Sequence, residues 1–255
     1  VDAEPIGVKA DRILDPGQAV ERVERGLRVQ DHPAFGIDPG ASGASGTLEK
    51  DVVLKAAEAL KAELETRADY QVVLVRDDDN FITLKDRVRA GRAAKADLFI
   101  SLHADSVSDA SVHGASVYTL SETASDSVAA ELERSENAAD IISGVDLSGN
   151  DEVGTILIDL AQRETKNRSS TFAQLLLPQL ERQTGLISKP HRFAGFRVLK
   201  APDVPSVLIE LGFLSNDTDE SRLTSPKWRA STAAAIARAV DGYYERMSSV
   251  AETGH

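Results

Sequence analysis

A short apolar run that ends in a single carboxylate is the feature that most constrains this chain. Residues 205–216 read PSVLIELGFLSN, so Val207-Leu-Ile209 leads straight into Glu210, and a glycine follows soon after. The pattern predicts a buried β-strand that delivers one acidic side chain to its own end. An isolated buried charge is strongly disfavoured. Glu210 therefore requires either an ion-pair partner or a chemical role.

Further apolar runs alternate with helical patterns along the chain. Residues 71–75, 97–103 and 115–120 are predicted strands, and helices are expected to begin at Asp51 and Thr83. Continuous apolar strands are typical of a sheet that is covered on both faces. The alternation predicts a single α/β domain with a mixed, mostly parallel sheet of about six strands flanked by helices. The remaining short strands are expected at 12–17, 28–31, 196–199 and 207–209.

The outer parts of the chain are less regular. We expect residues 1–26 to form an N-terminal extension or a displaced first strand, residues 27–247 to form the main domain, and residues 248–255 to form a tail. Ser225-Pro226 is typical of a capped helix start with proline at the first helical position, which predicts a long last helix.

The charge of the chain is strongly acidic and uneven. The net charge is −12 and the pI is about 4.9, which argues against nucleic acid as a partner because phosphate binding needs a basic surface. Residues 120–159 contain ten acidic residues and the single basic residue Arg134. Such a block is typical of a solvated face or of an inserted segment. Helices are expected inside it at 128–142 and from residue 152 onward.

Composition also narrows the choice of metal ligands and of compartment. The chain has no cysteine, so any metal must be held by His, Asp or Glu. No apolar run approaches the roughly 18 residues of a membrane span, and no signal-peptide segment is visible. The first residue is Val1 rather than Met, and we expect an upstream targeting segment to have been removed.

Two predicted strands end in polar side chains that could meet. His103 follows one apolar run and Glu210 follows another, and sites in open α/β sheets gather at the carboxyl ends of strands. Glu49 lies after a glycine-rich loop, just before the helix expected from Asp51. Taken singly, each residue has an ordinary explanation: a structural histidine, a paired carboxylate, or an acidic residue at a helix start. Their joint occurrence favours a functional site.

Four ordered motifs together resemble the zinc-dependent N-acetylmuramoyl-L-alanine amidases of the amidase-3 type. Residues 37–52 (IDPGASGASGTLEKDV) resemble the second half of the first family motif, and residues 75–79 (VRDDD) with Leu84 and Arg87 are similar to the middle motif. The histidine strand and the final motif are matched by residues 96–105 (ADLFISLHAD) and 198–216. The resemblance covers residues 27–247.

The resemblance implies a zinc ion held by His, Glu and His, with an open position for water. It carries Glu49 and His103 over as zinc ligands. It makes Glu210 the catalytic carboxylate that takes a proton from the water and passes it to the leaving amine. The implied reaction is hydrolysis of the amide bond between N-acetylmuramic acid and L-alanine in peptidoglycan.

The first histidine ligand of the family is displaced in this chain. The family motif places it four residues before Asp38, where this chain has Ala34. An alternative alignment uses Asp15-Pro-Gly-Gln18, with glutamine where histidine belongs. In both alignments His32 is the nearby imidazole, and we take it as the third ligand. The competing interpretation is a metal site that lacks one ligand.

The acidic insertion, at about residues 121–165, resembles the division-associated branch of the family, whose activity is held off until an activator binds. A helix lying across the cleft could supply a carboxylate to the open zinc position and act as a reversible switch. Glu122 and Glu136 are the two candidates. The alternative is a solvated helical hairpin that only recruits partners.

The resemblance implies a periplasmic hydrolase that splits septal cell wall. Its expected partners are peptidoglycan and an activator protein of the LytM type that binds the helical insertion. The alternative function is a non-catalytic protein of the same fold that binds cell wall or division partners, because its first ligand motif is degenerate.

Overall fold

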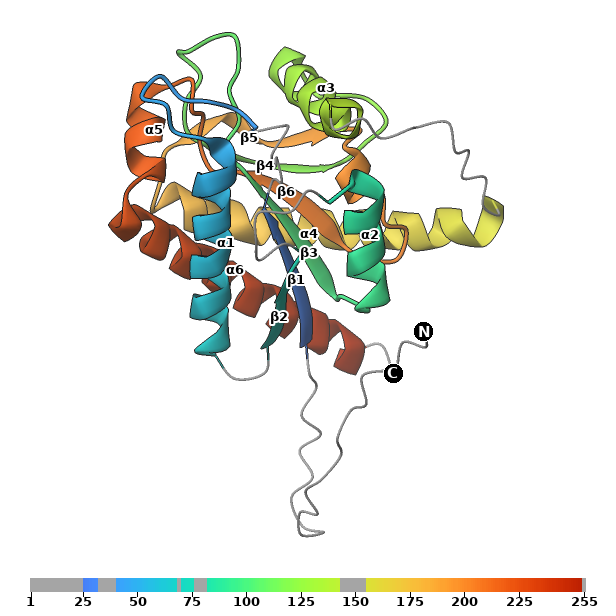
Figure 1. Cartoon of the computed structure of the whole chain (residues 1–255). Coiled ribbons are helices and arrows are strands. Elements are labelled where there is room, and N and C mark those ends of the chain that lie inside the picture. Colours follow the sequence, from blue (N-terminus) through green and yellow to red (C-terminus); the bar gives the residue numbers. More distant parts are fainter. Residues whose placement is uncertain (1–24, 32–39, 68–69, 76–81, 143–154, 254–255) are drawn as a thin grey trace, which may run out of the picture.

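The computed structural model describes residues 25–31, 40–67, 70–75, 82–142 and 155–253, which form a sheet with helices on both faces (Figure 1). The six strands lie in the order β2-β1-β3-β6-β4-β5. Neighbouring strands are parallel except at the β4–β6 pair, which is antiparallel. The strands are β1 (Arg25–Asp31), β2 (Tyr70–Leu74), β3 (Leu98–His103), β4 (Ala115–Leu120), β5 (Leu186–Ala194) and β6 (Ser206–Glu210). The predicted mixed α/β architecture is confirmed.

Six α-helices and one 3-10 turn surround the sheet in the described residues. They are α1 (Glu49–Glu65), α2 (Leu84–Ala93), α3 (Ser127–Ile142), α4 (Thr155–Glu181), η1 (Arg197–Leu199), α5 (Asp217–Leu223) and α6 (Pro226–Thr253). The helix start predicted at Ser225-Pro226 is confirmed, and α6 continues well into the segment expected to be a tail. No helix in the described part of the chain is long and apolar enough to cross a bilayer.

The strand predicted at 196–199 is wrong. Residues 197–199 form the 3-10 turn η1, and the strand is β5, which lies earlier in the chain. Phe196 and Val198 are buried in the core, so their apolar character reflects packing rather than an extended backbone. β5 is an edge strand that contains Pro190, which edge strands tolerate, and half-exposed edge residues do not form a continuous apolar run. The strand expected at 12–17 lies outside the described residues.

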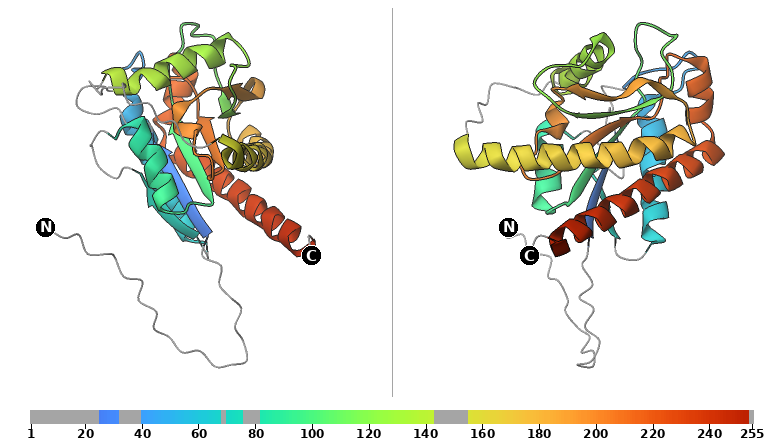
Figure 2. Two further views of the ribbon diagram at one scale, coloured as in Figure 1. Left: turned by 90° about the vertical axis from the view of Figure 1, so that its right-hand side faces the viewer. Right: turned by 180° about the vertical axis from the view of Figure 1, so that it is seen from behind.

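The core has two parts, one on each face of the sheet. Alternate strand residues point to opposite faces, so Leu98, Ile100 and Leu102 of β3 pack with α1, α4 and α6, whereas Phe99 packs on the side of α2 and α3. Figure 2 shows α4 and α6 crossing the sheet side by side. On the α2–α3 side, Ser101 and His103 continue the alternation that Phe99 begins. Polar groups of β3 therefore all face the same side of the sheet.

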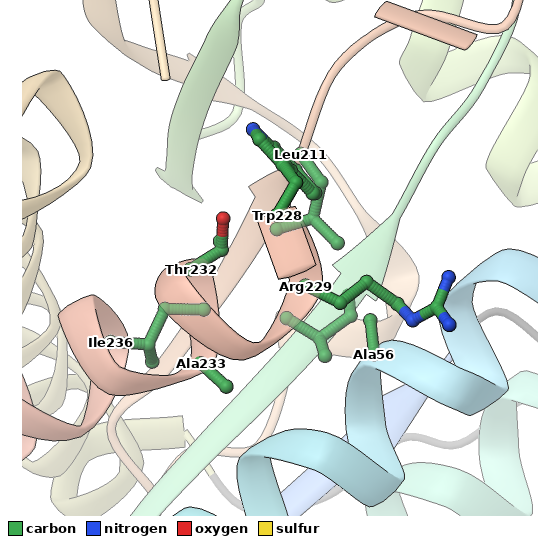
Figure 3. Close-up of a pocket in the computed structure, with 8 residues that line it drawn as sticks. Ala56, Leu211, Trp228, Arg229, Thr232, Ala233 and Ile236 are labelled. Atoms are coloured by element: carbon green, nitrogen blue, oxygen red, sulfur yellow. The ribbon is translucent and has the colours of Figure 1, made fainter. Parts of the chain in front are cut away.

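Packing on the α1–α6 side is tight. A cavity of about 10 Å³ lies among Ala56, Leu211, Trp228 and Ile236 (Figure 3). This volume is close to that of a single water. This space cannot hold a substrate. The polar side chains of the candidate site lie elsewhere, at the carboxyl ends of the central strands.

Candidate metal and catalytic site

The pairing of β3 with β6 sets the geometry of the site. His103 and Glu210 are direct partners in the parallel register, so the two residues at the carboxyl ends of neighbouring strands project from the same face. Both side chains are almost fully buried, at 1% exposure each. The imidazole Nε2 of His103 lies 2.8 Å from the hydroxyl of Ser101, two residues earlier on the strand. The other ring nitrogen, Nδ1, faces the site.

Glu49 enters this site from the first turn of α1. Its Oε1 accepts a hydrogen bond of 2.9 Å from the Ala104 N–H, and its Oε2 accepts one of 3.0 Å from the Ala41 N–H. Oε1 also lies 3.6 Å from Nδ1 of His103. The carboxylate is held on both sides by backbone donors, which fixes its orientation toward the imidazole.

A second carboxylate reaches His103 from α3. Glu136 Oε2 lies 3.4 Å from His103 Nδ1, and Glu136 is buried. One ligand atom each from Glu49, His103 and Glu136 fall within 4.8 Å of one another. Carboxylate and imidazole are ordinary zinc ligands, and a divalent cation would neutralise the excess negative charge of this buried group. The donor set therefore fits zinc.

The pKa of His103 reflects the carboxylates that surround it. Burial alone would lower the pKa of His103, but the carboxylates of Glu136 and Glu49 outweigh burial and hold this pKa well above its usual range. A metal ion would have to displace that proton, because only the neutral imidazole is a ligand.

Glu210 lies beside this group as a separate carboxylate. Its Oε1 accepts a hydrogen bond of 2.8 Å from the Asp105 N–H. Burial, together with the negative charge of Asp105, raises the pKa of Glu210 well above its usual range. Carboxylates with raised pKa values are suited to general acid–base catalysis, because they can both accept and return a proton near neutral pH.

Glu122 and Glu136, the two candidates for an inhibitory carboxylate, lie in different environments. Glu136 lies in the buried group, whereas Glu122 is exposed and lines a separate cavity of about 890 Å³ with residues such as Lys166 and Arg197. His32 lies outside the described residues. β1 ends at Asp31, which pairs with Leu102 in the parallel register, one residue before His103.

Several contacts dock α3 against the rest of the domain. The side chain of Asn137 donates to the carbonyl of Gly195 at 3.2 Å and accepts from the Arg197 N–H at 2.8 Å. Asp140 accepts a buried hydrogen bond of 2.8 Å from the N–H of Leu84, the first residue of α2. These bonds and the Glu136–His103 contact lie along one helix. α3 therefore covers the end of the sheet where the buried group lies (Figure 1).

Sequence reasoning missed Ser101, Asn137 and Asp140. A signal was available for Ser101, which is a polar residue inside an apolar strand and two positions before His103, on the same face. No comparable signal marks Asn137 or Asp140, since acidic and amide residues on a helix are ordinarily solvated.

The fold and the buried group define an α/β protein with a candidate divalent-metal site at the carboxyl edge of its sheet. Residues 32–242 match the amidase-3 family, described as N-acetylmuramoyl-L-alanine amidase. The chain belongs to this family.

Individual relatives agree with the family match. The chain is 42% identical over 209 residues to N-acetylmuramoyl-L-alanine amidase AmiC of Neisseria meningitidis serogroup B, covering 82% of this chain and 50% of that protein. It is 36% identical over 244 residues to N-acetylmuramoyl-L-alanine amidase AmiA of Escherichia coli K12, covering 95% of this chain and 78% of that protein. The chain spans about half the length of the AmiC relatives that it matches.

A solved structure of an amidase has a similar fold. N-acetylmuramoyl-L-alanine amidase AmiC2 of Nostoc punctiforme superposes with a TM-score of 0.63 at 28% identity, covering 86% of this chain and 97% of that one.

The hydrogen bond between Ser101 and His103 provides a test of metal binding at the site. As a metal ligand, His103 would be oriented by the partner of its other ring nitrogen. Ser101→Ala would then weaken binding of added Zn²⁺ by about 10- to 100-fold, the range of such outer partners. Ser101→Thr, which keeps the hydroxyl, should bind zinc nearly as the wild type does. The dissociation constants can be measured by competition with a chromogenic chelator.

Ser116 provides the matched control, because it is equally buried and pairs with Glu210 but has no hydrogen bond to His103. Equal zinc affinity of Ser101→Ala and Ser116→Ala would show that the hydroxyl of Ser101 does not orient the ligand.

Proposed function

We propose that this chain is a zinc-dependent amidase that hydrolyses the bond between N-acetylmuramic acid and L-alanine in peptidoglycan. One observation carries the proposal: Glu49, His103 and Glu210 converge at the carboxyl ends of adjacent strands, with both carboxylates held by consecutive backbone N–H groups. Membership of the amidase family supports the choice of substrate. Glu49 and His103 would hold the metal, with His32 as the third ligand.

The proposed reaction divides roles among the residues of the site. When bound, zinc supplies a Lewis acid that polarises the scissile carbonyl and makes water more acidic. Glu210 takes the proton of the attacking water and passes it to the nitrogen of L-alanine as the amide bond breaks. The raised pKa of Glu210 suits both halves of this transfer. Ser101 and the Ala104 N–H hold His103 and Glu49 in position.

The position of Glu136 supports a second part of the proposal, which concerns regulation. Glu136 would occupy the open zinc position and keep the enzyme inactive while α3 is docked. Displacement of α3 by an activator of the LytM type would free the site, as in other order-change switches. The proposed setting is septal wall splitting in the periplasm, as the resemblance implies.

The role of Glu210 can be tested by substitution with its neutral isostere. Glu210→Gln removes the proton acceptor and should lower the rate of dye release from labelled peptidoglycan by about 10²- to 10⁴-fold, as expected for loss of a general base. Zinc content, measured by elemental analysis, should not change. Full activity of this variant would contradict the assigned mechanism.

Removal of the Glu136 carboxylate should raise the rate of hydrolysis, whereas Glu210→Gln lowers it. Glu136→Ala abolishes the contact with His103, and we expect basal hydrolysis to rise by about tenfold, equivalent to about 1.4 kcal/mol of lost inhibition. Glu133→Ala is the matched control, because Glu133 lies on the same helix but against Gly195. If both variants are no more active than the wild type, Glu136 does not inhibit.

The third ligand can be tested through the metal itself. We expect His32→Ala to weaken zinc binding by more than the roughly 10- to 100-fold that an outer-shell partner contributes. Stoichiometric zinc with unchanged affinity would exclude His32 from the site. A wild-type protein that binds no zinc and releases no dye would instead favour a non-catalytic wall-binding protein.

A further inference from the structure

The orientation of Glu49 depends on the loop that precedes it. Ala41 pairs twice with Glu49: its N–H donates to the carboxylate at 3.0 Å, and its carbonyl accepts from the Glu49 N–H at 2.9 Å. The loop is closed on itself by the Ser42–Leu48 bridge and by a hydrogen bond of 2.8 Å from the Gly43 N–H to the Thr47 carbonyl. A shift of this loop would therefore move the carboxylate of Glu49.

A carboxylate from a distant segment holds the tip of this loop. Glu220 of α5 accepts hydrogen bonds from the N–H of Ser45, at 3.2 Å to Oε1, and from the Ser45 hydroxyl. The two residues are 175 positions apart in the sequence. Glu220 is only 5% exposed although it sits on a short surface helix. A buried carboxylate is stable there because several donors satisfy it.

Gly43 shows how closely the loop and the carboxylate fit. A Cβ atom at position 43 would lie 2.2 Å from Oε1 of Glu220, a distance at which the carboxylate must move away. Burial raises the pKa of Glu220, but the hydrogen bonds from Ser45 and Thr47 outweigh burial and hold the pKa below its usual value. Glu220 is therefore ionised, and its acceptors remain available to the loop.

The helix that carries Glu220 is itself anchored beside Glu210. The side chain of Asn216 caps α5. Asp219 Oδ2 accepts a hydrogen bond of 2.7 Å from the Gly114 N–H and one of 3.1 Å from the Phe213 N–H, three residues after Glu210. The bond from Phe213 joins α5 to the segment that follows β6. The carboxylate of Glu220 connects this helix to the Glu49 loop.

We propose that Glu220 is a positioning residue that ties the Glu49 loop to the segment following Glu210 and thereby sets the spacing between the metal ligand and the catalytic carboxylate. This inference rests on the proposed function, because it assigns Glu220 a role toward the same zinc site. Glu220 itself touches neither the metal ligands nor the substrate in this assignment.

The test compares zinc binding and loop protection in matched variants. Glu220→Gln keeps the shape but loses one acceptor and the charge, and should weaken zinc binding by about tenfold, the low end for outer partners. The amides of residues 41–48 should exchange hydrogen faster than in the wild type, while α6 remains protected. Asp217→Asn is the control, because Asp217 is an exposed acidic residue on the same helix and should leave both quantities unchanged.

Gly43→Ala places a Cβ atom where the carboxylate of Glu220 now lies and so displaces it. This variant should therefore reproduce both effects of Glu220→Gln. Wild-type zinc affinity and wild-type loop exchange in Glu220→Gln would overturn the inference alone. If Glu220→Gln lowers thermal stability but binds zinc as tightly as Asp217→Asn does, Glu220 is merely structural and the inference also fails. A wild-type protein that binds no zinc would overturn the proposed function and this inference with it.

Discussion

The backbone at the end of β3 positions the histidine and two of the carboxylates of the site. His103 supplies the imidazole, the next N–H, from Ala104, holds Glu49, and the following N–H, from Asp105, holds Glu210. These donors are available because the strand has left its ladder at this point, so their hydrogen bonds go to side chains rather than to a neighbouring strand. Three consecutive residues thus convert the end of one strand into a scaffold for two carboxylates.

This arrangement explains how three acidic side chains can be buried around one histidine. Burial of an ionised carboxylate is costly unless hydrogen bonds or an opposite charge compensate. Glu49 has two backbone donors, and Glu136 stabilises the protonated form of His103, as the raised pKa of that histidine records. In the proposed holoenzyme, the cation would take over the role of that proton.

Much of the fold and of the candidate site could be predicted from the sequence. Each prediction that was wrong or missing has a physical cause. Glu49, His103 and Glu210 could be found because each ends or begins an element whose boundaries are marked by apolar periodicity, and the structure brings all three together. The choice between Glu122 and Glu136 could not be made, because it depends on how α3 is rotated and docked. The strand predicted at 196–199 is wrong, and β5 could not be predicted in its place, because an edge strand lacks the apolar continuity of the central strands. His32 lies outside the described residues, and its role stays a prediction.

The docking of α3 has a consequence for the proposed switch. Glu136 faces His103, and one helical turn later Asp140 accepts the hydrogen bond of the Leu84 N–H at the start of α2. Helix starts leave N–H groups without intrahelical partners, so α2 relies on α3 for one of them. Withdrawal of Glu136 from the site would also break this bond and the Asn137 contacts with the turn at Gly195. In the proposed switch, release of the site would therefore be coupled to the environment of α2 and of the β5–η1 turn. An activator would have to compensate several hydrogen bonds, of which the Leu84–Asp140 bond is buried. Each is worth about 0.5–1.5 kcal/mol, which favours a switch with two discrete states over gradual opening.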